Sequence, residues 1–137
     1  MRTLISGDYS LFRQNWERTA GVYMASGLIT NEQYPNPIYV GGAQELRIRI
    51  VDSHLPLLKR GNHYSEGFQN YFNLFGEKNV AWFLLEECDK YSALDREKYY
   101  LGIYKPYSST NSGFNVKEAT TGWLTNIYTK ETVYFDG

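Results

Sequence analysis

The sequence predicts a single domain of the mixed α/β (α+β) class, with a small, mostly antiparallel sheet of about three strands flanked by helices. Three observations lead to this prediction. The chain has 137 residues, the length of one domain. Hydrophobic residues make up 42% of it, enough for a modest core. Strand-like and helix-like segments also follow one another in the order strand, strand, helix, helix, strand, helix, hairpin.

The first two strands are predicted around residues 21–25 and 37–41, each a short apolar run centred on a tyrosine. The loop between them contains glycine, asparagine and two prolines, which favour turns. The pair is therefore expected to form a hairpin with a long connection. Before it, residues 1–20 are interpreted as a helical N-terminal extension, with Ser10 as a candidate cap.

Two helices are predicted next. In residues 43–60 the apolar positions recur near helical spacing, but Pro56 removes one intrahelical hydrogen bond, so a kink or break is expected near His54. The second helix begins after Ser65 as N-cap. Its aromatic residues recur at i, i+3, i+4 and i+7, and Gly76 ends it.

The remaining elements are a strand, a helix and a hairpin. Residues 79–88 form a nearly continuous apolar run, typical of a central strand buried on both faces. Ser92 is the predicted cap of a helix over 92–104. A C-terminal hairpin extension is predicted within 120–137. We interpret 1–137 as one domain.

Charge and cysteine content restrict the class of protein. The net charge is −1, so any basic surface for nucleic acid must be local. Cys88 is the single cysteine, which excludes an intrachain disulfide and fits a reducing compartment. No apolar run reaches the roughly 20 residues that span a bilayer, and the N-terminus lacks a signal-peptide pattern. We expect an intracellular protein without a membrane partner, in the cytoplasm of a bacterium or phage-infected cell, or in an organelle.

A glutamate lies on the predicted inner face of the helix over 92–104. Leu94, Glu97, Leu101 and Tyr104 are spaced so that they share one face. A carboxylate on a buried face must be paired, protonated or bound to a metal. Two interpretations remain open: a structural glutamate that forms a salt bridge or reaches solvent, and a functional carboxylate.

An arginine borders the apolar stripe of the helix over 43–60. Arg49 lies three residues after Leu46 and next to Ile50. It could be the structural partner of Glu97 or another acid, or a fixed guanidinium that binds phosphate oxygens. Both interpretations place Arg49 and Glu97 on the sheet-facing sides of their helices.

These residues resemble the signature of a known family, the GIY-YIG nuclease superfamily, and most of all the catalytic domains of phage and intron homing endonucleases. Any one of the matching motifs would be weak evidence, but together they occur in the right order within residues 21–119. The matching positions are Gly21-Val22-Tyr23, Tyr39-Val40-Gly41, Arg49, Glu97 and Asn115. The resemblance implies the GIY-YIG nuclease fold for residues 21–119.

The resemblance also implies roles for the matching residues. Tyr39 would contact the attacking water and help to deprotonate it, while Tyr23 would line the same pocket. Arg49 would hold the phosphate and stabilise its developing charge. Glu97 would be the sole protein ligand of one divalent cation, Mg²⁺, which Mn²⁺ could replace.

Two further residues are carried over from the family. Asn115 would orient the phosphate or anchor the site. His54 matches a histidine of the first helix, which activates water or contacts phosphate in many members. Here it lies five residues after Arg49, whereas members of this type often have four. Together with Pro56, this spacing leaves the role of His54 open.

A small basic patch follows the first helix. Lys59, Arg60 and His63 could contact the DNA backbone, although such clusters are often solvated helix ends. Arg47 points away from the apolar stripe and is the fourth candidate for contact with DNA.

The predicted function is that of a GIY-YIG endonuclease, a divalent-metal-dependent phosphodiester hydrolase of the homing or mobile-element type, acting on double-stranded DNA. The alternatives are a restriction endonuclease of the same fold and a non-catalytic nucleic-acid-binding module. A homodimer remains open.

Overall fold

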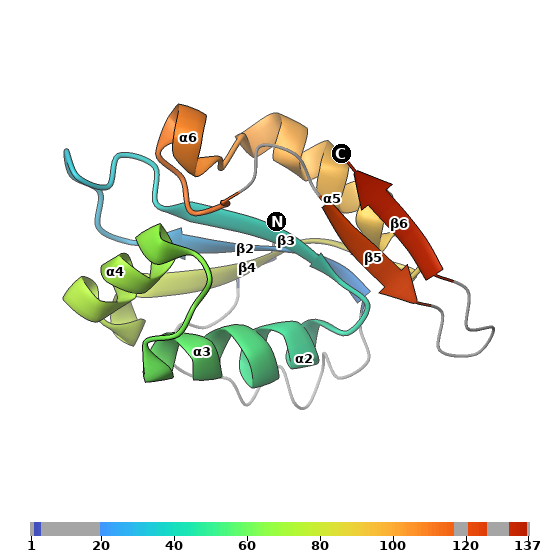
Figure 1. The fold of residues 1–137 in the computed structure, drawn as a ribbon, viewed down its shortest axis with the longest axis horizontal. Coiled ribbons are helices and arrows are strands. Elements are labelled where there is room, and N and C mark those ends of the chain that lie inside the picture. The colour runs from blue at the N-terminus through green and yellow to red at the C-terminus, as the bar shows by residue number, and fades with distance from the viewer. Residues whose placement is uncertain (1, 4–19, 117–120, 126–131, 137) are drawn as a thin grey trace.

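The structure is a computed structural model that describes residues 2–3, 20–116, 121–125 and 132–136. A sheet lies between two layers of helices (Figure 1). Its strand order is β1-β4-β2-β3, and all neighbouring strands are antiparallel. The strands are β1 (Arg2–Thr3), β2 (Ala20–Gly27), β3 (Ile38–Ala43) and β4 (Val80–Cys88).

The helical segments follow the predicted order. In Figure 1, α2 and α3 lie below the sheet and α4 at its left end, and α5 and α6 lie above it; α4 shares its core with α2 and α3. These helices are α2 (Leu46–Arg49), α3 (Leu55–Arg60), α4 (Glu66–Phe75), α5 (Ala93–Tyr104) and α6 (Ser108–Asn111). A π-helical turn, η1 (Ile50–His54), joins α2 to α3, and a 3₁₀ turn, η2 (Glu77–Asn79), precedes β4.

The predicted α+β class is confirmed, with three longer strands and the two-residue β1 at one edge. The predicted C-terminal hairpin forms from β5 (Thr121–Thr125) and β6 (Thr132–Asp136), which pair antiparallel. The helix predicted within residues 1–20 falls mostly on 4–19, outside the described residues. No helix in the described part of the chain has the length and apolar character to span a membrane.

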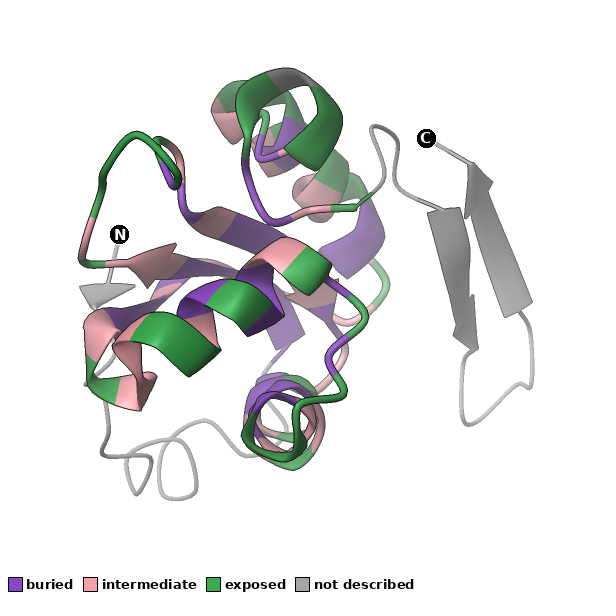
Figure 2. Cartoon of the chain, turned by 60° about the vertical axis from the view of Figure 1, so that its left-hand side comes forward, coloured by how far each residue is buried: buried purple, intermediate pink, exposed green. Residues whose placement is uncertain are grey.

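Each face of the sheet carries its own core, and buried residues line the sides of strands and helices that face each other (Figure 2). On the face covered by α2 to α4, Trp82 and Tyr23 pack with Phe68 and Leu46. On the opposite face, Leu101 of α5 belongs to a smaller cluster. The two tyrosines of the predicted hairpin therefore face α2 to α4, and Glu97 lies on the helix that covers the other side.

The predicted break near His54 takes a specific form. The helix continues from α2 into α3 through η1, where the N–H of Leu55 bonds to the carbonyl of Ile50, five residues earlier. This wider turn lies directly before Pro56, which cannot donate a backbone hydrogen bond. The π-helical turn inserts one residue into the helix without ending it.

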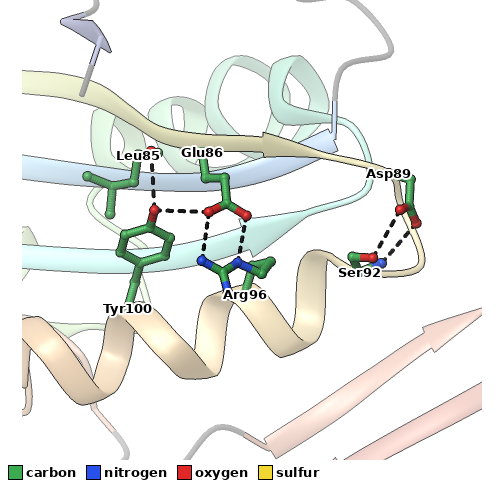
Figure 3. Close-up of polar contacts among 6 residues, drawn as sticks. All are labelled: Leu85, Glu86, Asp89, Ser92, Arg96 and Tyr100. Atoms are coloured by element: carbon green, nitrogen blue, oxygen red, sulfur yellow. Dashed lines mark hydrogen bonds and ion pairs between the residues drawn. The ribbon is translucent and has the colours of Figure 1, made fainter.

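The caps of α4 and α5 differ from each other. Ser65 caps α4 as predicted, because its hydroxyl accepts a hydrogen bond from the N–H of Phe68. Ser92 lies at the predicted N-cap position of α5, but its side chain makes no capping hydrogen bond, and its hydroxyl donates instead to the carboxylate of Asp89 (Figure 3). Asp89 also accepts from the N–H of Ser92, so it organises the turn before α5.

An ion pair on one side of α5 fixes this helix to β4. The guanidinium of Arg96 donates two hydrogen bonds, of 2.6 and 2.8 Å, to the carboxylate of Glu86 (Figure 3). Tyr100, one turn later on the helix, donates to the same carboxylate at 3.1 Å. These contacts fix the turn of α5 that contains Glu97.

Candidate active site

Tyr23 and Tyr39 lie on the same face of the sheet. In the β2–β3 ladder, Tyr23 is opposite Gly41 and Ala25 is opposite Tyr39. Side chains two positions apart on a strand point to the same face, so both phenols face α2 to α4. Their ring centroids are 6.3 Å apart. Burial raises the pKa of both phenols well above 10.

Two glycines of β3 make room for groups from both faces of the sheet. A Cβ on Gly41 would lie 2.4 Å from the Tyr23 hydroxyl oxygen. A Cβ on Gly42 would lie 3.2 Å from Oε2 of Glu97. Consecutive residues of a strand face opposite sides of the sheet. Gly41 therefore leaves room for the phenol of Tyr23 on one side, and Gly42 leaves room for the carboxylate of Glu97 on the other.

Glu97 reaches this point from α5. Burial raises its pKa to about 7, opposed by a hydrogen bond from the N–H of Gly42 and by the charge of Arg49. Within the described part of the chain, Glu97 forms no salt bridge. The structural interpretation of Glu97 as an ion-pair partner is therefore not the one found.

Arg49 ends α2 at the rim of the same group of residues. Among the described residues it forms no ion pair with a carboxylate, Glu97 included. Its positive charge nevertheless acts on the site, since it opposes the effect of burial on the pKa of Tyr23 and Glu97. The residue is exposed. It can therefore meet an anion from solvent.

His54 is brought into the site by the π-helical turn. Because η1 accommodates the extra residue, the ring lies against both tyrosines, with centroids 5.6 Å from Tyr23 and 5.0 Å from Tyr39. Its Nε2 is 2.5 Å from the Tyr23 hydroxyl oxygen. The five-residue spacing from Arg49 is thus compatible with a position inside the site.

The basic patch expected after the first helix does not include His63, which is 7% exposed. Both ring nitrogens are engaged: Nδ1 accepts from the N–H of Ser65 at 3.0 Å, and Nε2 is 2.8 Å from Nδ1 of His54. Its pKa is lowered to about 4 by burial. The surface position expected of His63 is not the one found, because its ring is enclosed among other aromatic rings, and its contact with DNA stays a prediction.

These hydrogen bonds determine which ring nitrogens of His63 and His54 carry a proton. His63 is neutral and its Nδ1 accepts a hydrogen bond from the N–H of Ser65, so its proton is on Nε2. The Nε2–H then donates a hydrogen bond to Nδ1 of His54. His54, neutral because burial and His63 lower its pKa, then carries its proton on Nε2. The Nε2–H of His54 donates to the Tyr23 hydroxyl. The backbone N–H of Ser65 therefore determines the direction of the hydrogen bonds from His63 to Tyr23.

Sequence reasoning missed Tyr64. Its hydroxyl is hydrogen-bonded to the Tyr39 hydroxyl, and its ring stacks on His63 with centroids 4.4 Å apart. Unlike the other rings of the site, it is 56% exposed. A single exposed tyrosine in a loop gives no periodic pattern, so the sequence holds no signal for this role.

Two solved structures share this architecture. One is a mutant of the catalytic domain of intron endonuclease I-TevI, 27% identical, covering 76% of this chain and 99% of that domain with a TM-score of 0.58. The other is the catalytic domain of homing endonuclease I-TevI, with 24% identity, 72% and 98% coverage and a TM-score of 0.56. No protein-family model matches the chain, and no curated protein matches it significantly.

The chain has the GIY-YIG nuclease fold. The resemblance seen in the five sequence motifs is therefore confirmed at the level of three-dimensional structure. Four of the motif residues meet in this fold around the glycine pair of β3: Tyr23, Tyr39, Arg49 and Glu97.

The fifth motif residue of the GIY-YIG pattern, Asn115, clamps the edge strand. Its amide oxygen accepts from the N–H of Val40, and its amide nitrogen donates to the Val40 carbonyl, both at 2.9 Å. The neighbouring Phe114 N–H donates to the carbonyl of Ile38 at 2.8 Å. Asn115 thus fixes the backbone next to Tyr39, which corresponds to the anchoring alternative rather than to contact with a phosphate.

The surface cations of this fold lie on the helices around the site. Arg47 pairs with Asp52 at 3.1 Å, and Lys59 pairs with Glu77 at 3.3 Å. Arg60 is exposed at the end of α3. Their contact with DNA stays a prediction.

The residues present fit a hydrated divalent cation. No group of three or more His, Cys, Asp or Glu that could hold a metal occurs among the described residues. Glu97 supplies a desolvated carboxylate without an ion-pair partner there. Mg²⁺ is commonly held by one or two carboxylates while it keeps several waters, so this one carboxylate suits it.

Proposed function

We propose that this protein is a divalent-metal-dependent DNA endonuclease that hydrolyses phosphodiester bonds, of the homing or mobile-element type. One observation carries the proposal. Two phenols, an exposed guanidinium and a desolvated carboxylate converge at the end of β3, on a fold similar to the catalytic domain of intron endonuclease I-TevI. The substrate class follows from that similarity, and the substrate is double-stranded DNA.

The positively charged part of the site binds the phosphodiester. Arg49 presents five N–H donors in a planar fork, which matches two phosphate oxygens. It is exposed and free of carboxylate partners among the described residues, so binding a phosphate breaks no ion pair there. The same charge stabilises the additional negative charge that develops on the phosphate oxygens during attack.

The phenol of Tyr39 faces the attacking water and accepts its proton while it gives up its own. Burial alone makes this difficult, because it raises the pKa of the phenol. The positive charge of Arg49 counteracts burial, because it favours the deprotonated form of Tyr39. Tyr23 is held by His54 and lines the same pocket.

Glu97 would hold the cation. A bound divalent cation would neutralise charge on the phosphate and stabilise the leaving oxygen. The N–H of Gly42 keeps the carboxylate in place from the sheet side. Mg²⁺ is the expected ion, and Mn²⁺ is expected to replace it.

A non-catalytic nucleic-acid-binding module is the second candidate. It would need a basic surface but no desolvated carboxylate beside two phenols, since burying a carboxylate costs stability. The full set of groups therefore favours the enzyme. A restriction enzyme of the same fold differs from a homing enzyme in its target, not in these residues.

The test separates cutting from binding. Purified protein is incubated with supercoiled plasmid DNA and Mg²⁺ or Mn²⁺, and the same DNA is used in a gel-shift assay with Ca²⁺. The expected result is nicked or linear plasmid with wild type only, and equal gel shifts for wild type and Glu97→Ala. DNA that is shifted but not cut by wild type, over many plasmids, would support the binding module instead. Mapping of the cut sites then distinguishes a homing target from a restriction target.

A further inference from the structure

The two tyrosines of the site belong to hydrogen-bond chains that end differently. From Tyr23 the chain runs inward through His54 and His63 to the backbone N–H of Ser65. An amide N–H does not give up its proton near neutral pH, so this chain holds Tyr23 in place and releases no proton. Tyr39 interacts with Tyr23 on one side, and on the other its hydroxyl is bonded to that of the half-exposed Tyr64.

Tyr39 has no direct route to solvent for a proton. The residue is 9% exposed, and its hydroxyl is bonded to that of Tyr64. A buried phenol that takes a proton from water must pass on its own proton, and here the Tyr64 oxygen is the group in contact with it. Tyr64 is 56% exposed as a residue while burial raises the pKa of its phenol, so it connects the buried Tyr39 hydroxyl to the surface of the protein.

We propose that Tyr64 is the proton outlet of the site, relaying to bulk water the proton that Tyr39 removes from the attacking water. This inference rests on the proposed endonuclease function and adds to it the residue that completes proton transfer. The phenols act as a relay, so neither has to exist as a free phenolate in the resting enzyme.

The step balances as follows. The attacking water loses a proton to the Tyr39 oxygen while its own oxygen bonds to phosphorus. Tyr39 passes its original proton to the Tyr64 oxygen, and Tyr64 passes its own to bulk water. The bond from phosphorus to the leaving oxygen breaks, and that oxygen takes a proton from solvent. Both phenols are neutral again at the end.

Two charged groups, Arg49 of α2 and Glu97 of α5, act on this pair of phenols. Burial raises the pKa of Tyr64, whereas the Tyr39 hydrogen bond and Arg49 of α2 act to lower it, and Glu97 of α5 acts to raise it. His63 stacks on the Tyr64 ring, and burial keeps it neutral at pH 7. The guanidinium of Arg49 is thus the nearby positive charge that favours loss of a proton from Tyr64.

The experiment measures plasmid cleavage with enzyme in excess over DNA, at pH 7 in dilute buffer with Mg²⁺. Tyr64→Phe keeps the ring and removes the relaying oxygen. We expect its rate to fall by at least about tenfold, a part of the roughly 100- to 10,000-fold that positioned proton transfer contributes. The matched control is Tyr91→Phe, which removes the hydroxyl of an equally exposed tyrosine (58%) in the turn after β4 and should cleave like wild type.

A second arm separates a relay from a merely structural hydrogen bond. Tyr64→Ala opens space beside Tyr39, and imidazole added to the buffer should restore its rate in a concentration-dependent manner, while wild type should not respond. Wild-type rates in Tyr64→Phe would overturn the relay and leave the endonuclease proposal standing. A loss in both variants without rescue by imidazole would show a structural role only and would also overturn it. Wild type that never cleaves would overturn the endonuclease proposal itself, and the relay with it.

Discussion

The ring of Tyr23 occupies the space that a side chain on Gly41 would need. The two residues are opposite each other in the β2–β3 ladder, and a Cβ on Gly41 would lie 2.4 Å from the Tyr23 hydroxyl oxygen and 2.6 Å from its Cζ. Tyr23 cannot move aside easily, because it is 1% exposed and bonded to His54. Gly41 therefore contributes to the site because it has no side chain and leaves this space to the ring.

The first prediction concerns this contact. Gly41→Ala should destabilise the fold by about 1–3 kcal/mol, the usual cost of overpacking, and should reduce cleavage strongly because it displaces the Tyr23 phenol. Denaturant unfolding and plasmid cleavage measure the two effects. Gly102→Ala is the control: a Cβ on Gly102 would meet no atom within 4 Å, and alanine in a helix should add roughly 0.5–1 kcal/mol of stability. Equal stability and activity of Gly41→Ala and wild type would contradict the account.

The second prediction concerns the charge of Glu97. Its pKa is about 7 in the folded protein against 4.5 for a free side chain, so the folded state favours the protonated form. The resulting stabilisation is present below pH 4.5 and is lost as the pH rises through about 7. In EDTA at pH 8, Glu97→Gln should melt at a higher temperature than wild type, and near pH 4 the difference should vanish.

The same pair of proteins reports on the cation without an activity assay. Mg²⁺ should raise the melting temperature of wild type at pH 8 by binding the native state, and it should not affect Glu97→Gln. Asp95→Asn, an exposed carboxylate of the same helix, is the control and should respond like wild type. An equal Mg²⁺ response in all three proteins would remove Glu97 as the ligand.

The third prediction concerns acid stability. The pKa of His63 is about 4 in the folded protein and about 6.5 in the unfolded chain, so only the unfolded chain takes up the proton between these values. Stability from the neutral ring is therefore present above pH 6.5 and is lost as the pH falls toward 4. Urea unfolding should show that His63→Gln loses about 1–2 kcal/mol less than wild type between pH 7 and pH 5. Parallel losses in the two proteins would mean that the ring is solvated.

The fourth prediction concerns the π-helical turn. Deletion of Ser53 removes the extra residue of η1, so Arg49 and His54 become four residues apart on a regular α-helix while both keep their positions. The deletion variant should remain folded by circular dichroism and cleave plasmid within about fivefold of wild type, since the rest of the site is unchanged. Alanine inserted between Ser53 and His54 is the opposite change. It should rotate one side of the helix by about 100° and abolish cleavage. A deletion variant as inactive as the insertion variant would show that the π-helical geometry itself is required.

Much of the fold follows from the sequence, because each strand and helix has a local signal. The apolar runs of β2, β3 and β4 and the Ser65 cap of α4 are examples of patterns that determine structure within a few residues. The meeting of Tyr23, Tyr39, Arg49 and Glu97 was predicted only through the order of the motifs. The hydrophobic periodicity of a segment predicts which face of a helix or strand a residue lies on. It does not predict which other element that face packs against.

The parts that the sequence does not reveal depend on contacts between distant segments. His63 looked like a member of a surface patch because Lys59 and Arg60 precede it, yet tertiary packing encloses it. The π-helical turn has no sequence signature other than Pro56 and an unusual spacing. Tyr64 gains its role only from the Tyr39 hydroxyl, 25 residues earlier in the chain.

The central claim is that the groups around the β3 glycines hydrolyse DNA with a cation held by Glu97. The most direct measurement is the rate of Mg²⁺-dependent plasmid cleavage by wild type, Glu97→Ala and Asp95→Ala, with enzyme in excess. We expect cleavage by wild type and Asp95→Ala and a loss of at least about 100-fold in Glu97→Ala, as is usual when electrostatic stabilisation of a reaction is removed. Cleavage by Glu97→Ala at the wild-type rate would contradict the claim.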